Sequence, residues 1–453
     1  MSDTIAAIST GSVLAGIGVL RLSGDDAITV ADRVFTPFRG AAMSRRPDRL
    51  LVYGTLHDAA GEVIDICLCT VSRAPHSYTG EHTAELQCHG GPTVLREGLE
   101  ALFAAGARQA KAGEFTKRAF LNGCMDLTQA EAVIDLIHAE TAEAAKNAAG
   151  QLGGAIQRHT DAIYDSLKEI SAHYHAVIDY PDEDIEDFTL EQYAANLRSA
   201  EETLERLCRS AARGKVLTGG VPTAIVGRPN AGKSSLLNAL LGYDRAIVTD
   251  VPGTTRDTIS ERVRFGGTLL NLTDTAGLRE TEDAVEALGV ARSRQALESA
   301  ELIFVLCDST QPFTTEDAEL LEQAHRTAPT VPVWTKCDLP SAGALPELGE
   351  GAVRISTVTG EGMEALEAAV AALFPKDASI AAGEILTNAR QAEAVERALQ
   401  SVRAARDAME QGMMPDAVLT ETEEAMSALG ELSGKTVRED ITDRIFARFC
   451  VGK

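Results

Sequence analysis

Basic residues are scarce in this 453-residue sequence. It has 42 lysines and arginines against 67 aspartates and glutamates, which gives a formal net charge of −25. This balance argues against a protein that grips nucleic acid over its whole surface. The deficit is uneven, because residues 1–120 hold 12 basic and 13 acidic side chains whereas residues 121–453 hold 30 and 54. Any contact with nucleic acid must therefore be local.

The sequence also lacks long apolar runs and Cys-x-x-Cys pairs. No apolar run approaches the ~20 residues that cross a bilayer, and the first residues lack the basic and long apolar segments of a secretion signal. The eight cysteines are scattered without a Cys-x-x-Cys pair, which is typical of thiols in a reducing cytosol. Cys67 and Cys69 are two residues apart in a β-rich run, so we expect them on one strand face. We therefore expect a soluble, cytoplasmic protein.

Changes in hydrophobic periodicity divide the sequence into four segments. Residues 1–120 mix short β-rich runs with a helical stretch near 92–106, which predicts an α+β domain. Residues 121–215 repeat apolar side chains at helical spacing, and residues 377–453 are again helical by composition. Between them, residues 216–376 alternate short apolar runs with helical sequence, which is typical of a parallel sheet with crossovers. We predict a multidomain protein with an α+β N-terminal domain and an α/β domain inserted into a discontinuous all-α domain. The predicted strands of the inserted domain are Thr223–Val226, Leu269–Leu272, Leu302–Leu306, Val331–Trp334 and Val353–Ile355.

A glycine-rich loop after the first of these strands carries the strongest chemical signal. Gly227–Ser234 reads GRPNAGKS, and its glycines let backbone amides turn toward phosphates at a helix N-terminus. In such a loop Lys233 reaches the outer phosphates, as a predicted catalytic residue, and Ser234 offers its hydroxyl to Mg²⁺. A chance glycine-rich turn is the alternative, but a strand and a helix flank the motif as a phosphate loop requires. The residues of this loop predicted to bind GTP are Asn230, Ala231, Gly232, Lys233, Ser234 and Ser235.

Four further motifs follow in the order of a guanine-nucleotide switch. In Gly253–Asp257, Thr255 can join Mg²⁺ only while a γ-phosphate is bound. The next motif follows a strand, where its Asp274 can hold the magnesium shell and a glycine amide can meet the terminal phosphate. Asp338 can accept from both N1–H and the exocyclic amine of guanine, which adenine does not offer, and a final loop closes over the base. The GTP-binding residues predicted here are Gly253, Thr254, Thr255, Asp274, Thr275, Ala276, Gly277, Thr335, Lys336, Asp338, Ser356, Thr357 and Val358.

Three positions depart from the usual pattern of such switches. Thr335 stands where most have Asn, although its hydroxyl still permits a hydrogen bond, and Thr357 stands where Ala is usual. Leu278 follows the Asp274 motif, where many GTPases carry the Gln that orients water. Catalysis must therefore draw on a group elsewhere.

The motifs and their flanks together resemble the MnmE (TrmE) family of GTPases over essentially the whole chain. The resemblance implies an N-terminal folate-binding and dimerising domain, a discontinuous helical domain and an inserted Ras-like P-loop domain. It also implies that a homodimer of this chain works with a partner protein, MnmG. The FAD cofactor is expected on MnmG and not on this chain. Together they would attach an aminomethyl or carboxymethylaminomethyl group at C5 of the wobble uridine of certain tRNAs, using a methylene-tetrahydrofolate carbon. The flanking motifs are Leu20–Gly24, Thr79–Glu81, Glu85–Pro92, Gly113–Asn122, Asp126–Ala132 and Phe449–Lys453.

The resemblance also implies a catalytic cation and a catalytic carboxylate. Potassium beside the phosphates would replace a missing arginine by neutralising charge in the transition state, with two GTPase domains meeting across the dimer. The water-orienting carboxylate maps onto Glu286. From the sequence alone, Asn230 could be a plain turn residue and Glu286 a solvated helix charge. Carried over by position, the potassium ligands are Asn230, Thr249, Val251 and Thr254, in a nucleotide-binding loop that includes Asp250 and Pro252.

A reduced folate needs a carboxylate for the guanidine-like donors of its pterin and cations for its glutamate tail. The resemblance places Glu85 at the pterin end and makes Arg21 and Lys453 further contacts. Cys124 stands where relatives often carry a basic residue, so we expect weaker folate binding. Arg21 could equally form a surface ion pair, and Glu85 could point outward from its strand. Cys450, of uncertain role, is either a buried free thiol or part of a Cys-x-Gly-Lys tail that reaches the folate pocket.

Two other functions compete with this interpretation. A ribosome-assembly GTPase would bind RNA without transfer chemistry, but residues 1–215 and the split helical segment oppose it. A metabolic folate-dependent transferase would leave the complete switch unexplained. The acidic run 179–187 predicts a solvated corner between helices, or a face that repels tRNA and leaves the near-neutral N-terminal region and MnmG to supply basic contacts.

Overall fold

The computed structural model forms two compact units, each assembled from separate stretches of the chain. The first contains Met1–Ile134, Gln151–Arg198 and Arg397–Lys453, and the second contains Asp135–Gly150 and Ser199–Glu396. The four segment boundaries predicted from the sequence remain a prediction. The structure describes residues 3–11, 14–179, 188–243, 261–272, 300–343, 345–349, 351–374, 380–436 and 439–452.

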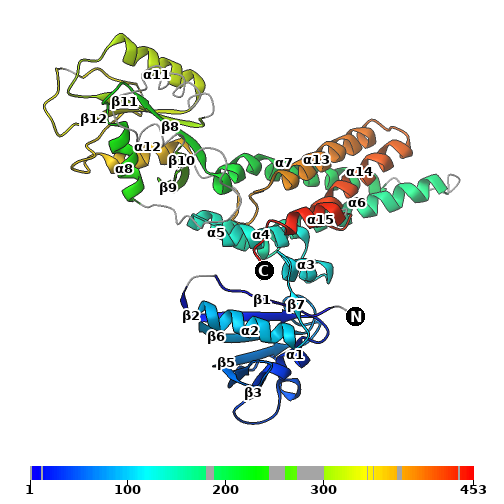
Figure 1. Ribbon diagram of the computed structural model, residues 1–453. Helices are drawn as coiled ribbons and strands as arrows, with labels where there is room; N and C mark the ends of the chain where they lie inside the picture. The colour runs from blue at the N-terminus through cyan, green and yellow to red at the C-terminus, as the bar shows by residue number, and fades with distance from the viewer. Residues whose placement is uncertain are drawn as a thin grey trace. The chain divides into compact units, whose positions relative to one another are not determined.

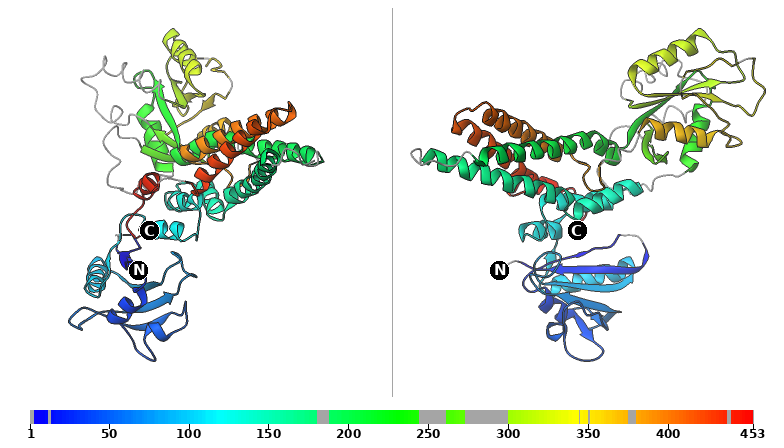
Figure 2. Two further views of the ribbon diagram at one scale, coloured as in Figure 1. Left: turned by 90° about the vertical axis from the view of Figure 1, so that its right-hand side faces the viewer. Right: turned by 180° about the vertical axis from the view of Figure 1, so that it is seen from behind.

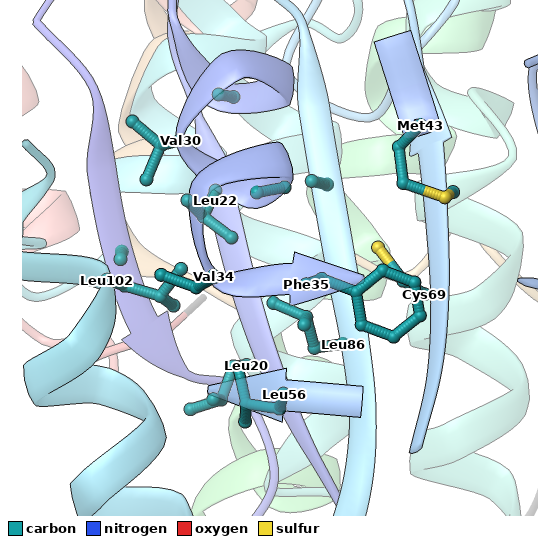
Figure 3. Close-up of a cluster of buried hydrophobic side chains, with 14 of the residues drawn as sticks. Leu20, Leu22, Val30, Val34, Phe35, Met43, Leu56, Cys69, Leu86 and Leu102 are labelled. Atoms are coloured by element: carbon teal, nitrogen blue, oxygen red, sulfur yellow. The ribbon is translucent and has the colours of Figure 1, made fainter. Parts of the chain in front are cut away.

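A sheet with two covering helices forms the N-terminal part of the first unit (Figure 1). Among the described residues it has seven strands in the order β3-β4-β5-β6-β2-β1-β7, antiparallel except for the pair β1–β7. Helices α1 and α2 bury apolar side chains against one face, as Figure 3 shows for Leu20, Val30 and Leu102. The elements are β1 (Ile5–Ile8), β2 (Ala15–Ser23), α1 (Ala27–Val34), β3 (Phe35–Pro37), η1 (Met43–Arg45), β4 (Val52–His57), β5 (Val63–Ser72), β6 (Thr83–Gly90), α2 (Pro92–Ala104) and β7 (Arg108–Gln109).

This sheet also tests the expectation for the paired cysteines. Cys67 and Cys69 are both buried on β5 and belong to the same apolar core. One strand face is therefore confirmed for the pair. The eight cysteines, which all lie in the described ranges, are free thiols.

Helices make up the rest of the first unit. Helix α6 packs along α14, and Figures 1 and 2 show the two side by side. The motif at Asp126 begins a helix through reciprocal bonds, because Asp126 Oδ1 accepts from the Gln129 amide (2.8 Å) while the Asp126 amide donates to Gln129 Oε1 (2.9 Å). The helices that lie wholly or partly in this unit are α3 (Glu114–Leu121), α4 (Leu127–Ile137), α5 (Ala142–Leu152), α6 (Ala155–Asp179), α7 (Phe188–Gly219), α13 (Ala389–Glu410), α14 (Pro415–Ser433) and α15 (Glu439–Phe446). The acidic run after Asp179 lies outside the described residues.

The second unit contains an α/β layered domain. In the described part of the chain six strands follow the order β13-β12-β11-β8-β10-β9. Helix α11 packs on one face, and α8 and α12 pack on the other (Figure 1). The elements are β8 (Val221–Gly227), α8 (Lys233–Tyr243), β9 (Glu261–Phe265), β10 (Thr268–Leu272), β11 (Leu302–Asp308), α11 (Thr315–Thr327), β12 (Thr330–Thr335), β13 (Val353–Arg354) and α12 (Met363–Leu373).

One strand of this sheet was not predicted. The five expected strands are present and parallel, but β9 is antiparallel to β10. The two are joined by Gly266 and Gly267, whose φ angles of 61° and 73° form a tight turn that other residues resist. The prediction of an entirely parallel sheet is therefore wrong, because this hairpin adds an antiparallel strand at the edge.

The segment that returns from the α/β domain, residues 383–386, is held by hydrogen bonds to α5 and α7. The side-chain oxygen of the buried Asn147 accepts from the amides of Gly383 (2.8 Å) and Ile385 (3.3 Å). Ser210 Oγ, also buried, accepts from the Leu386 amide (3.0 Å). Glycine permits the close approach, since a Cβ at Gly214 would lie 1.7 Å from the Leu386 carbonyl oxygen. The return segment thus has its backbone polar groups satisfied by side chains of both helices.

None of the helices in the described ranges is long and apolar enough to cross a membrane.

Candidate functional site

The phosphate loop lies between β8 and α8, where the sequence predicts it. A Cβ at Gly227 would lie 2.5 Å from the Leu306 carbonyl oxygen, so glycine is required where the loop leaves the sheet. Asn230 has a φ of 62°, a left-handed conformation that asparagine tolerates, and Gly232 has a φ of 94°. These turns bring the chain around to the N-terminus of α8 at Lys233. The result is a concave backbone surface suited to an anion.

Lys233 points back into this loop. Its Nζ donates to the carbonyl oxygens of Gly227 (2.7 Å) and Arg228 (2.9 Å). Burial lowers the pKa of the Lys233 ammonium, because desolvation penalises the charged form. A polyphosphate in the loop would supply the negative charge that the ammonium lacks here.

The base-recognition motif is tied to the phosphate loop. Thr335 Oγ1 donates to the Ala231 carbonyl oxygen at 2.7 Å, so the Thr in place of Asn still makes a hydroxyl hydrogen bond. Lys336 has a φ of 57°, and its Nζ lies 2.7 Å from Asp308 Oδ2. Asp338 is exposed on the turn that follows β12. Its carboxylate is therefore open to a ligand from solvent.

The loop that follows β13 is held by its own serine. Ser356 is fully buried, and its Oγ accepts from the amides of Val358 (3.3 Å) and Thr359 (3.1 Å). The Cys337 amide donates to the Ile355 carbonyl oxygen at 3.1 Å, which joins this loop to the base-recognition motif. Val358 is 85% exposed. The structure thus brings together the described parts of three predicted GTP-binding motifs.

A cavity of about 310 Å³ adjoins the phosphate loop and was not predicted from the sequence. One wall is an ion pair in which Arg228 Nη1 lies 3.3 Å from Asp317 Oδ2. Asp317 also forms a capping box with Thr314 at the start of α11, so the Thr-x-x-Asp pattern was the available signal. The lining residues are Arg228, Pro229, Asn230, Ala231, Cys307, Asp308, Thr310, Gln311, Pro312, Phe313, Asp317, Trp334 and Lys336.

Several predicted site residues cannot be placed. Among the described residues, His, Cys, Asp and Glu form no group that could hold a metal ion. Of the predicted metal ligands, Ser234 and Asn230 lie within the described ranges. The predicted residues outside those ranges are Thr249, Asp250, Val251, Pro252, Gly253, Thr254, Thr255, Asp274, Thr275, Ala276, Gly277, Glu286 and Lys453.

The predicted folate residues Arg21 and Glu85 lie directly opposite each other on β2 and β6. Arg21 Nε and Glu85 Oε1 are 2.9 Å apart, with side chains 20% and 32% exposed. The Arg21 guanidinium lies over the rings of Tyr78 (5.5 Å) and Phe115 (5.8 Å). The pair is half-buried between aromatic rings, where a flat ligand could compete for either charge.

An ionic network supports the loop beside this pair. Arg118 is 9% exposed and lies 2.9 Å from Glu81 and 3.0 Å from Glu114. Ser23 Oγ donates to Glu81 at 2.8 Å. The Thr79–Glu81 loop turns at Gly80, where φ is 75° and an added Cβ would lie 3.0 Å from Cys124 Sγ. Cys124 therefore lies beside this loop, and its place in a folate site stays a prediction.

The C-terminal tail pairs with the N-terminal domain. Val451 forms an antiparallel bridge with Ala112, and Ser9 Oγ donates to the Gly452 carbonyl oxygen at 2.9 Å. Cys450 is exposed, so the buried-thiol alternative is wrong. Its neighbour Phe449 is buried against Leu127. Because successive residues of an extended tail face opposite sides, Cys450 faces solvent.

The sheet order β13-β12-β11-β8-β10-β9, with a phosphate loop after β8, defines a Ras-like P-loop domain. In the sequence this domain is inserted into the helical part, which follows the α+β domain. This confirms the predicted fold class. Comparison with known proteins then identifies the family. Residues 127–450 match the family model of the MnmE helical domain, and residues 4–124 match that of the GTP-binding protein TrmE N-terminus.

Relatives match over the full length. The chain is 46% identical to the tRNA modification GTPase MnmE of Symbiobacterium thermophilum, with 100% of this chain and 99% of the relative covered. It is 44% identical to the protein of the same name from Chloroflexus aurantiacus and 42% identical to that from Alkaliphilus metalliredigens, with 100% of both chains covered in each case. The chain belongs to the MnmE family, which confirms the resemblance seen in the sequence.

Proposed function

We propose that this chain, a GTP hydrolase by its family and fold, modifies the wobble uridine of certain tRNAs and uses GTP hydrolysis to drive the conformational change that this requires. The observation that carries the proposal is 46% identity over the whole chain to a protein named tRNA modification GTPase. A shared GTPase domain alone would not indicate which reaction the chain takes part in. Identity across the helical and N-terminal segments supports the same task for the whole molecule.

The GTP site assigns a role to each described motif. Backbone amides of the phosphate loop bind the phosphates, and Lys233 neutralises charge on the outer ones. Ser234 and Thr255 would hold Mg²⁺, and Asp274 would support its other ligands. Asp338 reads guanine. The fit is supported by the left-handed turns at Asn230 and Gly232, which leave the loop concave toward the N-terminus of α8.

Potassium, when bound beside the phosphates, would supply positive charge of the kind that a catalytic arginine provides. Its proposed ligands are Asn230, Thr249, Val251 and Thr254, and Glu286 orients water once two GTPase domains of a homodimer meet. The position of Asn230 supports this assignment, because the residue is exposed on the phosphate loop. When bound, the ion would stabilise charge on the β- and γ-phosphate oxygens.

Turnover of GTP in potassium and in sodium tests this site. We expect Glu286→Ala to bind GTP as wild type does but to lose turnover, and wild type to be much faster in potassium. Undiminished turnover of Glu286→Ala would remove Glu286 from the mechanism, and equal rates in both salts would remove the ion.

The N-terminal domain binds a tetrahydrofolate derivative, the 5,10-methylene form in the reaction. Glu85 takes the pterin end, and Arg21 and Lys453 contact the rest, near Cys124. The aromatic rings beside the Arg21–Glu85 pair and the ordered tail at Gly452 support this site. When bound, folate would supply the one-carbon unit, in a cytoplasmic complex with an FAD-containing MnmG partner. Calorimetry with 5-formyl-tetrahydrofolate should show saturable heat that Arg21→Ala reduces, and absence of heat in wild type would rule out the site.

A further inference from the structure

An arginine-rich loop at the edge of the N-terminal sheet stands out in an acidic chain. Strand β3 is the outermost strand of that sheet, and the loop after it reads FRGAAMSRRPDR over residues 38–49. The loop carries four arginines, and Arg73, which directly follows β5, donates hydrogen bonds to the Ser44 and Arg46 carbonyl oxygens of the loop. Against these five arginines stand Asp32 and Asp48. The loop is therefore locally positive in a chain whose net charge is −25.

The acidic groups beside this loop are already engaged. Asp48 pairs with Arg73. Asp32 accepts the amides of Met43 (2.6 Å) and Ser44 (3.1 Å), which anchors the loop to α1. In the described part of the chain, the guanidinium groups of Arg39 and Arg45 make neither a hydrogen bond nor an ion pair, and both side chains are exposed. Two cations are thus free to meet an anion from solvent.

The loop is shaped before any ligand arrives. Arg46 folds inward, where its guanidinium donates to the carbonyl oxygens of Arg39 and Ala41. Gly40 has a φ of 82°, and an added Cβ there would lie 2.7 Å from Arg46 Nη2. Met43 is fully buried beneath the loop. A fixed loop loses little conformational entropy when it binds.

Exposed aromatic rings adjoin the arginines. Phe38 and Tyr53 are 52% and 58% exposed, and their ring centroids lie 5.0 Å apart. Together with Arg39, Arg46, Leu51 and Val52 they line an open hollow of about 520 Å³. Aromatic faces stack on unpaired bases, and arginines bind the phosphates between them, so this combination is typical of single-stranded nucleic acid sites.

We infer that the hollow formed by Phe38, Arg39, Arg46, Leu51 and Tyr53, with Arg45 beside it, binds unpaired nucleotides of the tRNA substrate. The inference rests on the proposed function for the identity of the RNA. Charge complementarity favours a polyanion over a second copy of this acidic chain. The rings would stack on bases, and Arg39 and Arg45 would contact phosphates.

Fluorescence anisotropy of the full-length protein with unmodified tRNA, over a series of salt concentrations, tests the inference. We expect Arg39→Ala/Arg45→Ala to weaken binding at least ~10-fold and to lower the slope of log affinity against log salt by about 1 to 2, since two phosphate contacts are lost. Arg96→Ala, which removes an exposed arginine from α2 of the same domain, is the matched control. Binding and slope equal to those of this control would overturn the inference.

The stacking contact has its own pair of variants. Tyr53→Ala should weaken tRNA binding at least ~5-fold, and Tyr53→Phe should leave it unchanged because the ring remains. Light scattering on the same samples measures the oligomeric state. A halved mass for Tyr53→Ala with unchanged tRNA binding would overturn the inference and assign the hollow to contact between copies.

A cell-based readout separates this inference from the proposed function. Wild-type protein that fails to restore modified uridines in a deletion strain would contradict the function itself. Restoration by wild type, together with tRNA binding by the arginine variant at wild-type strength, would contradict only the hollow. The Arg39→Ala/Arg45→Ala variant and the Arg96→Ala control should both retain GTP turnover, because neither changes a residue of the GTP site.

Discussion

At the scale of single residues, we propose that Asp338 sets the base preference of the GTP site. Its exposed carboxylate follows β12, which Thr335 ties to the phosphate loop. A carboxylate can accept two hydrogen bonds from guanine, and each such charged bond contributes about 1.5–3 kcal/mol. Loss of this acceptor should therefore lower both the affinity for GTP and the discrimination between guanine and other bases.

We expect Asp338→Asn to bind GTP at least ~100-fold more weakly, because the Asn NH2 group meets the exocyclic amine of guanine, donor against donor, and the remaining bond to N1–H loses its charged acceptor. Xanthosine triphosphate should bind instead, because its 2-oxo group accepts where guanine donates and the amide supplies a donor. Competition with a fluorescent nucleotide measures both affinities, and tight xanthosine binding shows that the variant is folded. Undiminished affinity for GTP would contradict the role of Asp338.

Glu114 links the stability of the first unit to acid pH. Burial opposes its charge, but hydrogen bonds from Arg108, the Lys111 amide and Arg118 outweigh this and lower the pKa of Glu114 from 4.5 to about 2. Since the folded-state pKa lies below the unfolded value, the stabilisation is complete above 4.5 and is lost as pH falls toward 2.

Glu114→Gln should cost on the order of 1–2 kcal/mol at neutral pH, after allowance for solvent screening. It should also flatten the fall of Tm in that acid range. Thermal unfolding at a series of pH values measures this, with the exposed Glu97→Gln as control. A fall as steep as that of wild type would show that Glu114 does not carry the effect.

At the scale of elements, the return segment after the G domain depends on two polar side chains. Asn147 and Ser210 satisfy backbone groups of residues 383–386 between α5 and α7. We expect Asn147→Ala to destabilise the protein by about 2–4 kcal/mol, because it strands two buried amides. Urea unfolding measures the loss. Lys146→Ala, on the exposed side of α5, should change little, and equal stability of the two variants would contradict this role of Asn147.

The strands that could be predicted from the sequence differ from the strand that could not in how apolar they are. The five predicted strands of the G domain are apolar runs buried in a layered sheet, and each is present. Strand β9 reads ERVRF, and its alternating charges at the sheet edge give a weak strand signal. Pairs such as Arg21 with Glu85 depend on strand register, which a single sequence does not specify. The arginine loop was visible as composition only, since its shape depends on Arg46 and Gly40.

At the scale of the whole molecule, we propose that one chain joins GTP hydrolysis to tRNA modification. Full-length identity of 42–46% to proteins named tRNA modification GTPase supports this claim more strongly than either site alone. In the proposed function, the described motifs recognise the nucleotide, and the Arg21–Glu85 ion pair is the proposed contact for a ligand of the N-terminal domain. Whether these serve one reaction is a question about the product in tRNA.

Mass spectrometry of nucleosides from bulk tRNA tests the claim most directly. The samples are a deletion strain, the same strain with the wild-type gene, and the same strain with a Lys233→Ala copy. We expect 5-aminomethyl-type uridines to disappear on deletion and to return with the wild-type copy only, because Lys233 acts at the phosphates. Unchanged wobble uridines on deletion, in a strain without a second enzyme for this modification, would refute the proposed function and favour a ribosome-assembly GTPase.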